Sequence, residues 1–151
     1  MKYQSKNELT QFNFNEASIV DITYQNSTLT FQLDNVTILA NNSNNRDIRD
    51  MRANDLLLTF EQVTITNFVA EGYKVYDADN NLTEAVSDDV VEKSQYTNVL
   101  KDLAGAVLYS IEETSKERCT INIDGEFQTY RIEVEYQQNL VKWDRFLNKE
   151  V

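Results

Sequence analysis

Histidine is absent from the 151-residue sequence, and cysteine occurs once, as Cys119. One cysteine cannot build a disulfide framework, and zinc or haem sites that use imidazole ligands are excluded. The absence of histidine also removes the side chain that most often acts as a general base near neutral pH. Cys119 alternates with Ile121 and Ile123, as core residues of a strand do. We therefore interpret it as a buried structural thiol and not as a nucleophile.

Proline is also absent, and the three glycines stand alone at positions 72, 105 and 125, which excludes a glycine-rich phosphate-binding loop. Turns must then depend on aspartate, serine and the 17 asparagines. No hydrophobic run approaches the roughly 18 residues that span a bilayer, and the first residues lack the apolar core of a secretory signal. We expect a cytoplasmic protein that does not associate with membranes.

Positive charge is scarce, with 14 Lys and Arg against 25 Asp and Glu, so the net charge is -11. A phosphate backbone is bound through clustered basic residues, so we expect no nucleic-acid partner. Residues 76–151 carry sixteen acidic and eight basic side chains, so most of the negative charge lies in this half. An acidic surface of this kind serves solubility, and it would also attract a basic partner.

Alternating apolar and polar residues predict strands over 18–24 and 28–38. The alternation slips by one residue near Asp34 and Asn35, which indicates a bulge. Residues 56–68 repeat the same pattern, Leu-Thr-Phe followed by Val-Thr-Ile. We interpret the two copies as neighbouring, similarly bent strands of one antiparallel sheet.

A short strand is predicted over 73–76, and the acidic stretch that follows it, 77–92, has no clear periodicity. Apolar residues at helical spacing predict a helix over 95–103, with Gly105 as its C-terminal cap.

The remaining sequence returns to strand character. Alternation predicts a strand over 106–112 with Tyr109 on its core-facing side, and another over 127–136. Asp124 followed by Gly125 is typical of a two-residue type I′ hairpin turn between strands.

Together these patterns predict an α+β, mainly β fold. We expect a single domain over 1–151 with about seven antiparallel, bulged strands and one or two short helices. Residues 1–11 are expected to be a loose N-terminal segment, 77–92 an acidic loop, and 139–147 a segment across a sheet edge. Most aromatic residues should fill the core; the alternative is an exposed contact patch that includes Trp143.

Residues 77–88 place oxygen-bearing side chains at positions 1, 3, 5, 7 and 12 of the EF-hand calcium loop. Leu82 stands at position 6, where the template requires glycine, and Asp88 at position 12, where the longer glutamate is usual. We therefore favour a solvated acidic loop and predict no metal site and no cofactor, with calcium binding as the alternative.

The segment Phe14-Asn15-Glu16-Ala17-Ser18-Ile19 resembles the Phe-His-Asp-Ala/Ser-x-Ile opening of a group of small bacterial proteins. These are YxiG-like uncharacterised proteins and certain immunity proteins of polymorphic toxin systems. The sequence departs from that opening at Asn15, where the group has histidine, and at Glu16, where it has aspartate. The resemblance implies a compact β-rich domain without catalysis that binds and neutralises a protein partner.

These observations lead to the hypothesis of a non-enzymatic, immunity-like protein-binding module that uses an acidic surface to engage a basic partner. The candidate partner-binding residues are Asp77, Asp79, Glu84, Asp88, Asp89 and Glu92. One alternative is a small-ligand-binding protein or carboxylate-dependent enzyme with its site in a sheet cleft. Another is a structural domain that forms homo-oligomers.

Overall fold

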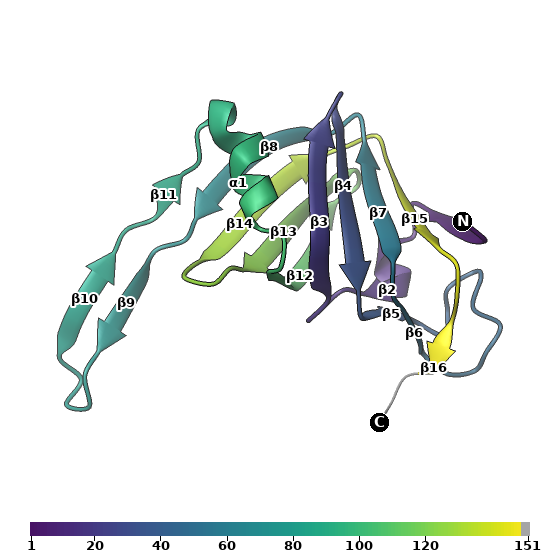
Figure 1. Ribbon diagram of the computed structural model, residues 1–151, viewed down its shortest axis with the longest axis horizontal. Coiled ribbons are helices and arrows are strands. Elements are labelled where there is room, and N and C mark those ends of the chain that lie inside the picture. Colours follow the sequence, from purple (N-terminus) through teal and green to yellow (C-terminus); the bar gives the residue numbers. More distant parts are fainter. Residues whose placement is uncertain (149–151) are drawn as a thin grey trace.

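The computed structural model describes residues 1–148, which fold mainly into antiparallel strands (Figure 1). These residues form sixteen strands, one α-helix and two 3-10 helices, so the mainly β prediction is confirmed but the expected number of strands was too low. The strands are β1 (Tyr3–Lys6), β2 (Phe12–Asn13), β3 (Ser18–Gln25), β4 (Thr28–Asp34), β5 (Val36–Ile38), β6 (Met51–Ala53), β7 (Leu56–Glu61), β8 (Thr64–Ala70), β9 (Tyr73–Tyr76), β10 (Leu82–Val86), β11 (Asp89–Val90), β12 (Val107–Ser115), β13 (Arg118–Asp124), β14 (Thr129–Glu135), β15 (Gln138–Trp143) and β16 (Leu147–Asn148). The helices are η1 (Leu9–Gln11), η2 (Lys93–Gln95) and α1 (Tyr96–Asp102).

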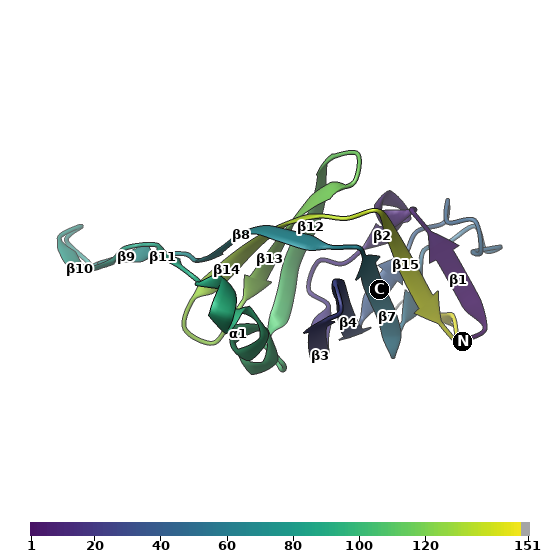
Figure 2. The same ribbon diagram turned by 90° about the horizontal axis from the view of Figure 1, so that it is seen from above.

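Ten strands form one large sheet in the order β1-β15-β7-β4-β3-β12-β13-β14-β8-β11. The sheet bends sharply between β3 and β12, which pair only at Ser18 and Val107, and Figure 2 shows the two halves inclined to one another. A four-stranded sheet, β16-β6-β5-β2, and a separate hairpin, β10-β9, complete the fold.

The two similar segments form neighbouring strands, as predicted, because β4 pairs with β7 along its length. Thr30 lies opposite Thr59, with their hydroxyl oxygens 3.4 Å apart. The slip predicted as a bulge at Asp34 and Asn35 is a break between strands, since Asn35 takes a φ of 63° and β5 joins the smaller sheet. Gln62, with a φ of 51°, makes the equivalent break after β7. One predicted strand thus becomes two at each position.

We expected residues 1–11 to be a loose segment, but strand β1 and the loop beside it anchor them to the body. Strand β1 pairs with β15 from Tyr3 opposite Trp143 to Lys6 opposite Leu140. The polar loop 41–45 is attached to it, because the side-chain amide of Asn42 donates a hydrogen bond to Ser5 Oγ at 3.2 Å. Because β15 lies between β1 and β7, it is the second strand of the large sheet. Residues 139–147 were expected to lie across a sheet edge, and that prediction was wrong.

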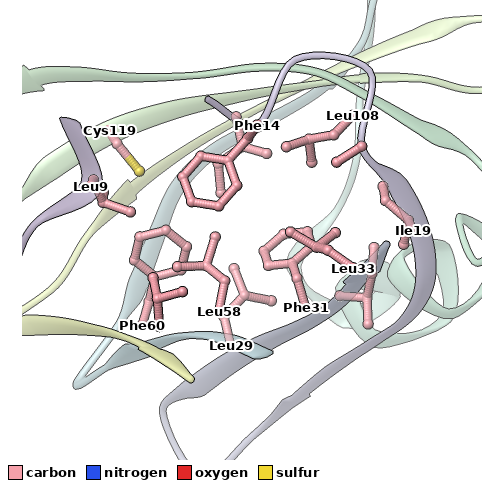
Figure 3. Close-up of a cluster of buried hydrophobic side chains, with 14 of the residues drawn as sticks. Leu9, Phe14, Ile19, Leu29, Phe31, Leu33, Leu58, Phe60, Leu108 and Cys119 are labelled. Carbon is pink, nitrogen blue, oxygen red and sulfur yellow. The ribbon is translucent and has the colours of Figure 1, made fainter. Parts of the chain in front are cut away.

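The core fills the space between the two halves of the bent sheet (Figure 3). Leu108 and Cys119 from one half face Phe31, Leu58 and Phe60 from the other, and all five are fully buried. The rings of Phe31 and Phe60 meet edge to face at 6.5 Å between centroids, a favourable arrangement for aromatic pairs.

Most aromatic residues lie in or against this core, as predicted. Trp143 is fully buried and packs on Tyr3, Phe12 and Phe146, so it belongs to no exposed patch.

Helix α1 forms where helical spacing predicted it, and Leu100 and Leu103 are buried. Gly105 is not its cap, because Leu103 occupies that position with an ordinary φ of -83°. Gly105 instead takes a φ of +93° two residues later, and its amide donates a hydrogen bond to the carbonyl of Ile19. The glycine therefore turns the chain after the helix, where it is bonded to β3, before β12 begins.

Two details of the strands that follow α1 differ from the prediction. Leu108 is the core residue of β12, and Tyr109 is exposed, because the backbone of Leu108 makes two hydrogen bonds to the turn at 14–17. The β13–β14 connection is a loop, 125–128, closed by a hydrogen bond from the amide of Gly125 to the carbonyl of Gln128, and not a two-residue turn.

Candidate functional site

A two-stranded hairpin projects from the body of the molecule (Figures 1 and 2). It consists of β9 and β10, which continue from β8 and return to β11, and we call residues 72–88 the arm. The sequence predicted β9, but β10 and β11 lie inside the stretch 77–92 that we expected to be a loop. Every residue of β9 and β10 is exposed except Val86, which is half-buried.

One face of the arm carries Tyr73, Val75, Glu84 and Val86. This follows from the register, because Tyr73 lies opposite Val86 and Val75 opposite Glu84, and directly opposed side chains share a face. The hydroxyl of Tyr73 donates a hydrogen bond of 3.5 Å to the Glu84 carboxylate. The face is therefore apolar with one acidic group.

The opposite face carries Lys74, Tyr76, Leu82 and Ala85, with Tyr76 opposite Leu82. Both of these large side chains are 54% exposed. A register shift between Leu82 and Glu84 places these two residues on different faces. The arm thus has apolar side chains on both faces.

The arm is held to the body at its base. The amide of Gly72 donates a hydrogen bond of 2.6 Å to Oδ1 of Asp88. A Cβ at Gly72 would fall 2.7 Å from the carbonyl carbon of Ser87 and 2.8 Å from the amide nitrogen of Asp88, so only glycine fits this close approach. The amide of Glu71 also donates to the carbonyl of Thr129 in β14.

The tip of the arm is a turn organised by Asp77. Its Oδ1 accepts hydrogen bonds of 2.9 Å from the amides of Asp79 and Asn81. These bonds, led by the one from Asn81, lower the pKa of Asp77 below its ordinary value. Asn80 supplies the positive φ that the turn requires.

The six candidate residues are placed along the arm and beyond its base, and they do not converge on one point. Asp77 and Asp88 use their carboxylates to hold backbone amides of the arm. Asp79, Glu84 and Asp89 are exposed. Glu92 is also exposed, and its carbonyl accepts the hydrogen bond from the amide of Gln95 that forms η2. Over residues 71–92 there are seven acidic side chains and one basic side chain, Lys74.

The arm does not have the geometry of a calcium loop. Residues 82–86 form β10, and the carboxylates of Asp77 and Asp88 face backbone amides at opposite ends of the hairpin. Within residues 1–148 no group of three or more His, Cys, Asp or Glu side chains is arranged to hold a metal ion.

The exposed apolar residues of the arm, Val75, Tyr76 and Leu82, were not among the residues predicted to bind a partner. The available signal was a hairpin pattern, two short runs with β-branched and aromatic residues on either side of Asp77-Ala78-Asp79-Asn80-Asn81. Val90, in β11 beside the arm, is also exposed.

Cys119 is a structural thiol, as predicted. It is 1% exposed, and burial, with a smaller contribution from Glu113, raises its pKa to about 12. The neighbouring Arg118 pairs instead with Glu135 at 2.8 Å. A thiol in this environment is a poor nucleophile.

The segment Phe14–Ile19 is a turn that enters β3. Phe14, Ala17 and Ile19 are buried, and the amide of Ala17 donates a hydrogen bond to the carbonyl of Phe14. Between them, Asn15 and Glu16 are exposed, and Glu16 has a φ of 68°. The segment therefore contributes three side chains to the core and forms the turn before β3.

An open groove of about 880 Å³ lies beside this turn. Three acidic residues line it, Glu16, Glu112 and Asp124, together with the exposed Tyr109. All three acidic residues are exposed to water.

Within the described part of the chain, no helix has the length and apolar character needed to cross a membrane. No protein-family model, curated protein or solved structure matches the chain.

Proposed function

We propose that this chain is a non-enzymatic protein-binding module and that the arm engages a basic protein partner. The observation that carries the proposal is the exposure of apolar side chains on both faces of the arm. An isolated two-stranded hairpin is marginally stable in water, and exposed aromatic residues are favoured at binding hot spots. A partner that covers Tyr76 and Leu82 would stabilise the hairpin and bury apolar area.

Charge defines the partner. Residues 71–92 carry seven acidic side chains and one basic side chain, so the arm and its base are negatively charged, and Asp79, Glu84 and Asp89 are exposed. A basic surface would associate faster with this segment, and the association would weaken as salt screens the charges. The partner's contact surface should therefore combine basic groups with an apolar centre.

The narrower form of the proposal is an immunity-like role, in which the partner is a toxin that this chain neutralises. It rests on the resemblance of Phe14–Ile19 to the opening segment of the small bacterial proteins, immunity proteins among them, that are named in the sequence analysis. Co-expression of a basic toxin with and without the chain tests this form, with survival as the expected result and unchanged toxicity as the contradicting one.

Site-specific photo-crosslinking tests the general proposal. A photoreactive phenylalanine derivative replaces Tyr76 on the arm or, as a matched control, Val20, an exposed residue of β3. In cells of the source organism we expect the arm position alone to capture a protein, which mass spectrometry should identify as basic. Binding of that protein after purification should weaken at high salt and in the variant Asp79→Asn, Glu84→Gln, Asp89→Asn.

Three outcomes would contradict the proposal: equal capture from both positions, capture of an acidic protein, and no capture from the arm. Crosslinking between two copies of this chain would also contradict it and would favour the homo-oligomeric alternative.

A further inference from the structure

A hollow of about 690 Å³ lies between the end of α1 and the 125–128 loop. Its apolar lining comes from both sides: Val99 and Leu103 from the helical side, and Phe127 and Tyr130 from the loop and β14. Phe127 is 83% exposed, which is unusual for a large apolar side chain. We call this space the α1–loop hollow.

Charge in the hollow has one sign. Asp102, Asp124 and Glu126 line it, and no lysine or arginine is among its lining residues. An apolar cavity with only carboxylates among its charged groups is complementary to a long cationic side chain. The aliphatic stem of such a side chain packs on apolar surface while its charged head stays at the wet, acidic rim.

We propose that the α1–loop hollow binds an arginine side chain presented by the protein partner. Arginine fits better than lysine, because its planar guanidinium is weakly hydrated, stacks on aromatic rings and bonds carboxylates in a bidentate manner. Phe127 and Tyr130 supply the rings, and Asp102 and Glu126 supply carboxylates on either side of the hollow. That this arginine belongs to a protein partner rests on the proposed function.

The hollow and the arm form one continuous surface. The same 125–128 loop lines a second, smaller hollow of about 350 Å³ together with Glu71, Gly72 and Tyr73 at the base of the arm. Figure 1 shows α1, this loop and the arm at the same end of the molecule. A partner that lies along the arm can therefore place an arginine in the hollow.

Titration of the ¹⁵N-labelled full chain with N-acetylarginine amide, followed by NMR, tests the proposal without any partner. The neutral isostere N-acetylcitrulline amide is the ligand control. We expect saturable shifts at the amides of Ala104, Gly105, Ala106 and Gly125 with the arginine derivative and at least fivefold weaker binding of the citrulline derivative. Absence of saturable shifts at these amides, or equal binding of both compounds, would overturn the proposal.

Variants locate the binding. Phe127→Ala removes a side chain that is mostly in water, so the fold should be retained while the arginine shifts decrease at least threefold. Asp102→Asn with Glu126→Gln should have a similar effect. Glu117→Gln, at the opposite end of β13 from Asp124, is the matched control and should leave the shifts unchanged. Equal shifts in all variants would place the binding elsewhere and overturn the proposal.

This experiment fails independently of the crosslinking experiment. If the arginine derivative binds but the arm captures no protein, the arginine site is supported and the proposed partner is rejected. If the arm captures a protein but the arginine derivative does not bind, the partner is supported and the arginine site is rejected.

Discussion

The amide of Gly72 lies 2.6 Å from Oδ1 of Asp88, and this hydrogen bond joins the two strands of the arm where they leave the body. Because no Cβ fits at Gly72, the Gly72→Ala substitution should force the two strands apart. We expect amide hydrogen exchange over 73–86 to accelerate to the rate of an unfolded chain, while exchange in β4 and β7 stays unchanged.

Asp88 provides the control for this prediction. Asp88→Asn keeps an oxygen acceptor for the Gly72 amide and should have little effect, whereas Asp88→Ala should accelerate exchange as Gly72→Ala does. If exchange over the arm is the same in all three variants, this contact does not hold the base.

The turn before β3 should be improved by a substitution at Glu16, whose φ of 68° is disfavoured for glutamate. Asparagine adopts this conformation more readily, so Glu16→Asn should raise the free energy of unfolding by roughly 0.5–1 kcal/mol. Urea denaturation measures the effect. Glu16→Gln removes the same charge without changing the backbone preference and should give a smaller change; an equal gain would assign the effect to charge.

Acid should loosen the tip of the arm. The folded-state pKa of Asp77 lies below its ordinary value of 3.8, so the stability that its carboxylate contributes is present above pH 3.8 and is lost as the pH falls through the lower, folded-state pKa. Amide shifts of Asp79 and Asn81, followed by NMR, should change in this acidic range. In Asp77→Asn the same amides should show no such transition; a transition that persists would assign it to another group.

Cys119 should be inert in the folded chain. A pKa of about 12 in place of the ordinary 9.0 lowers the thiolate fraction at pH 8 by roughly a thousandfold, and burial adds a steric barrier. Ellman's reagent should therefore label Cys119 only after the chain is unfolded in guanidinium chloride. Rapid labelling at pH 8 without denaturant would show that the thiol is accessible.

The parts of the fold that could be predicted are those in which one face of a strand is buried. Leu29, Phe31 and Leu33 alternate with polar residues in β4, and the same holds for Ile132 and Val134 in β14. Burial on one face leaves this alternation in the sequence, so strand and core face were both predicted correctly.

The prediction failed where a strand does not show burial on one face as a simple alternation in the sequence. Strand β10 is exposed on both faces, so Leu82–Val86 shows no alternation of buried and wet residues. In β12, Leu108 and Tyr109 are both apolar, and hydrogen bonds from the 14–17 turn, far away in sequence, decide which one faces the core. Of the candidate site, the sequence indicated the acidic side chains, but it did not indicate the projecting hairpin that presents them.

The pairing of β1 with β15, and of β15 with β7, has a consequence for synthesis of the chain on the ribosome. Strands β3, β4 and β7 are translated early and can pair at once, but the outer edge of β7 has no partner until Gln138–Trp143 has been made. During this interval the nascent chain exposes unpaired backbone groups beside Leu57 and Thr59, the type of edge that attracts other strands. Completion of the large sheet is therefore a late event, and protection of β7 by chaperones would matter most before residue 138 is translated.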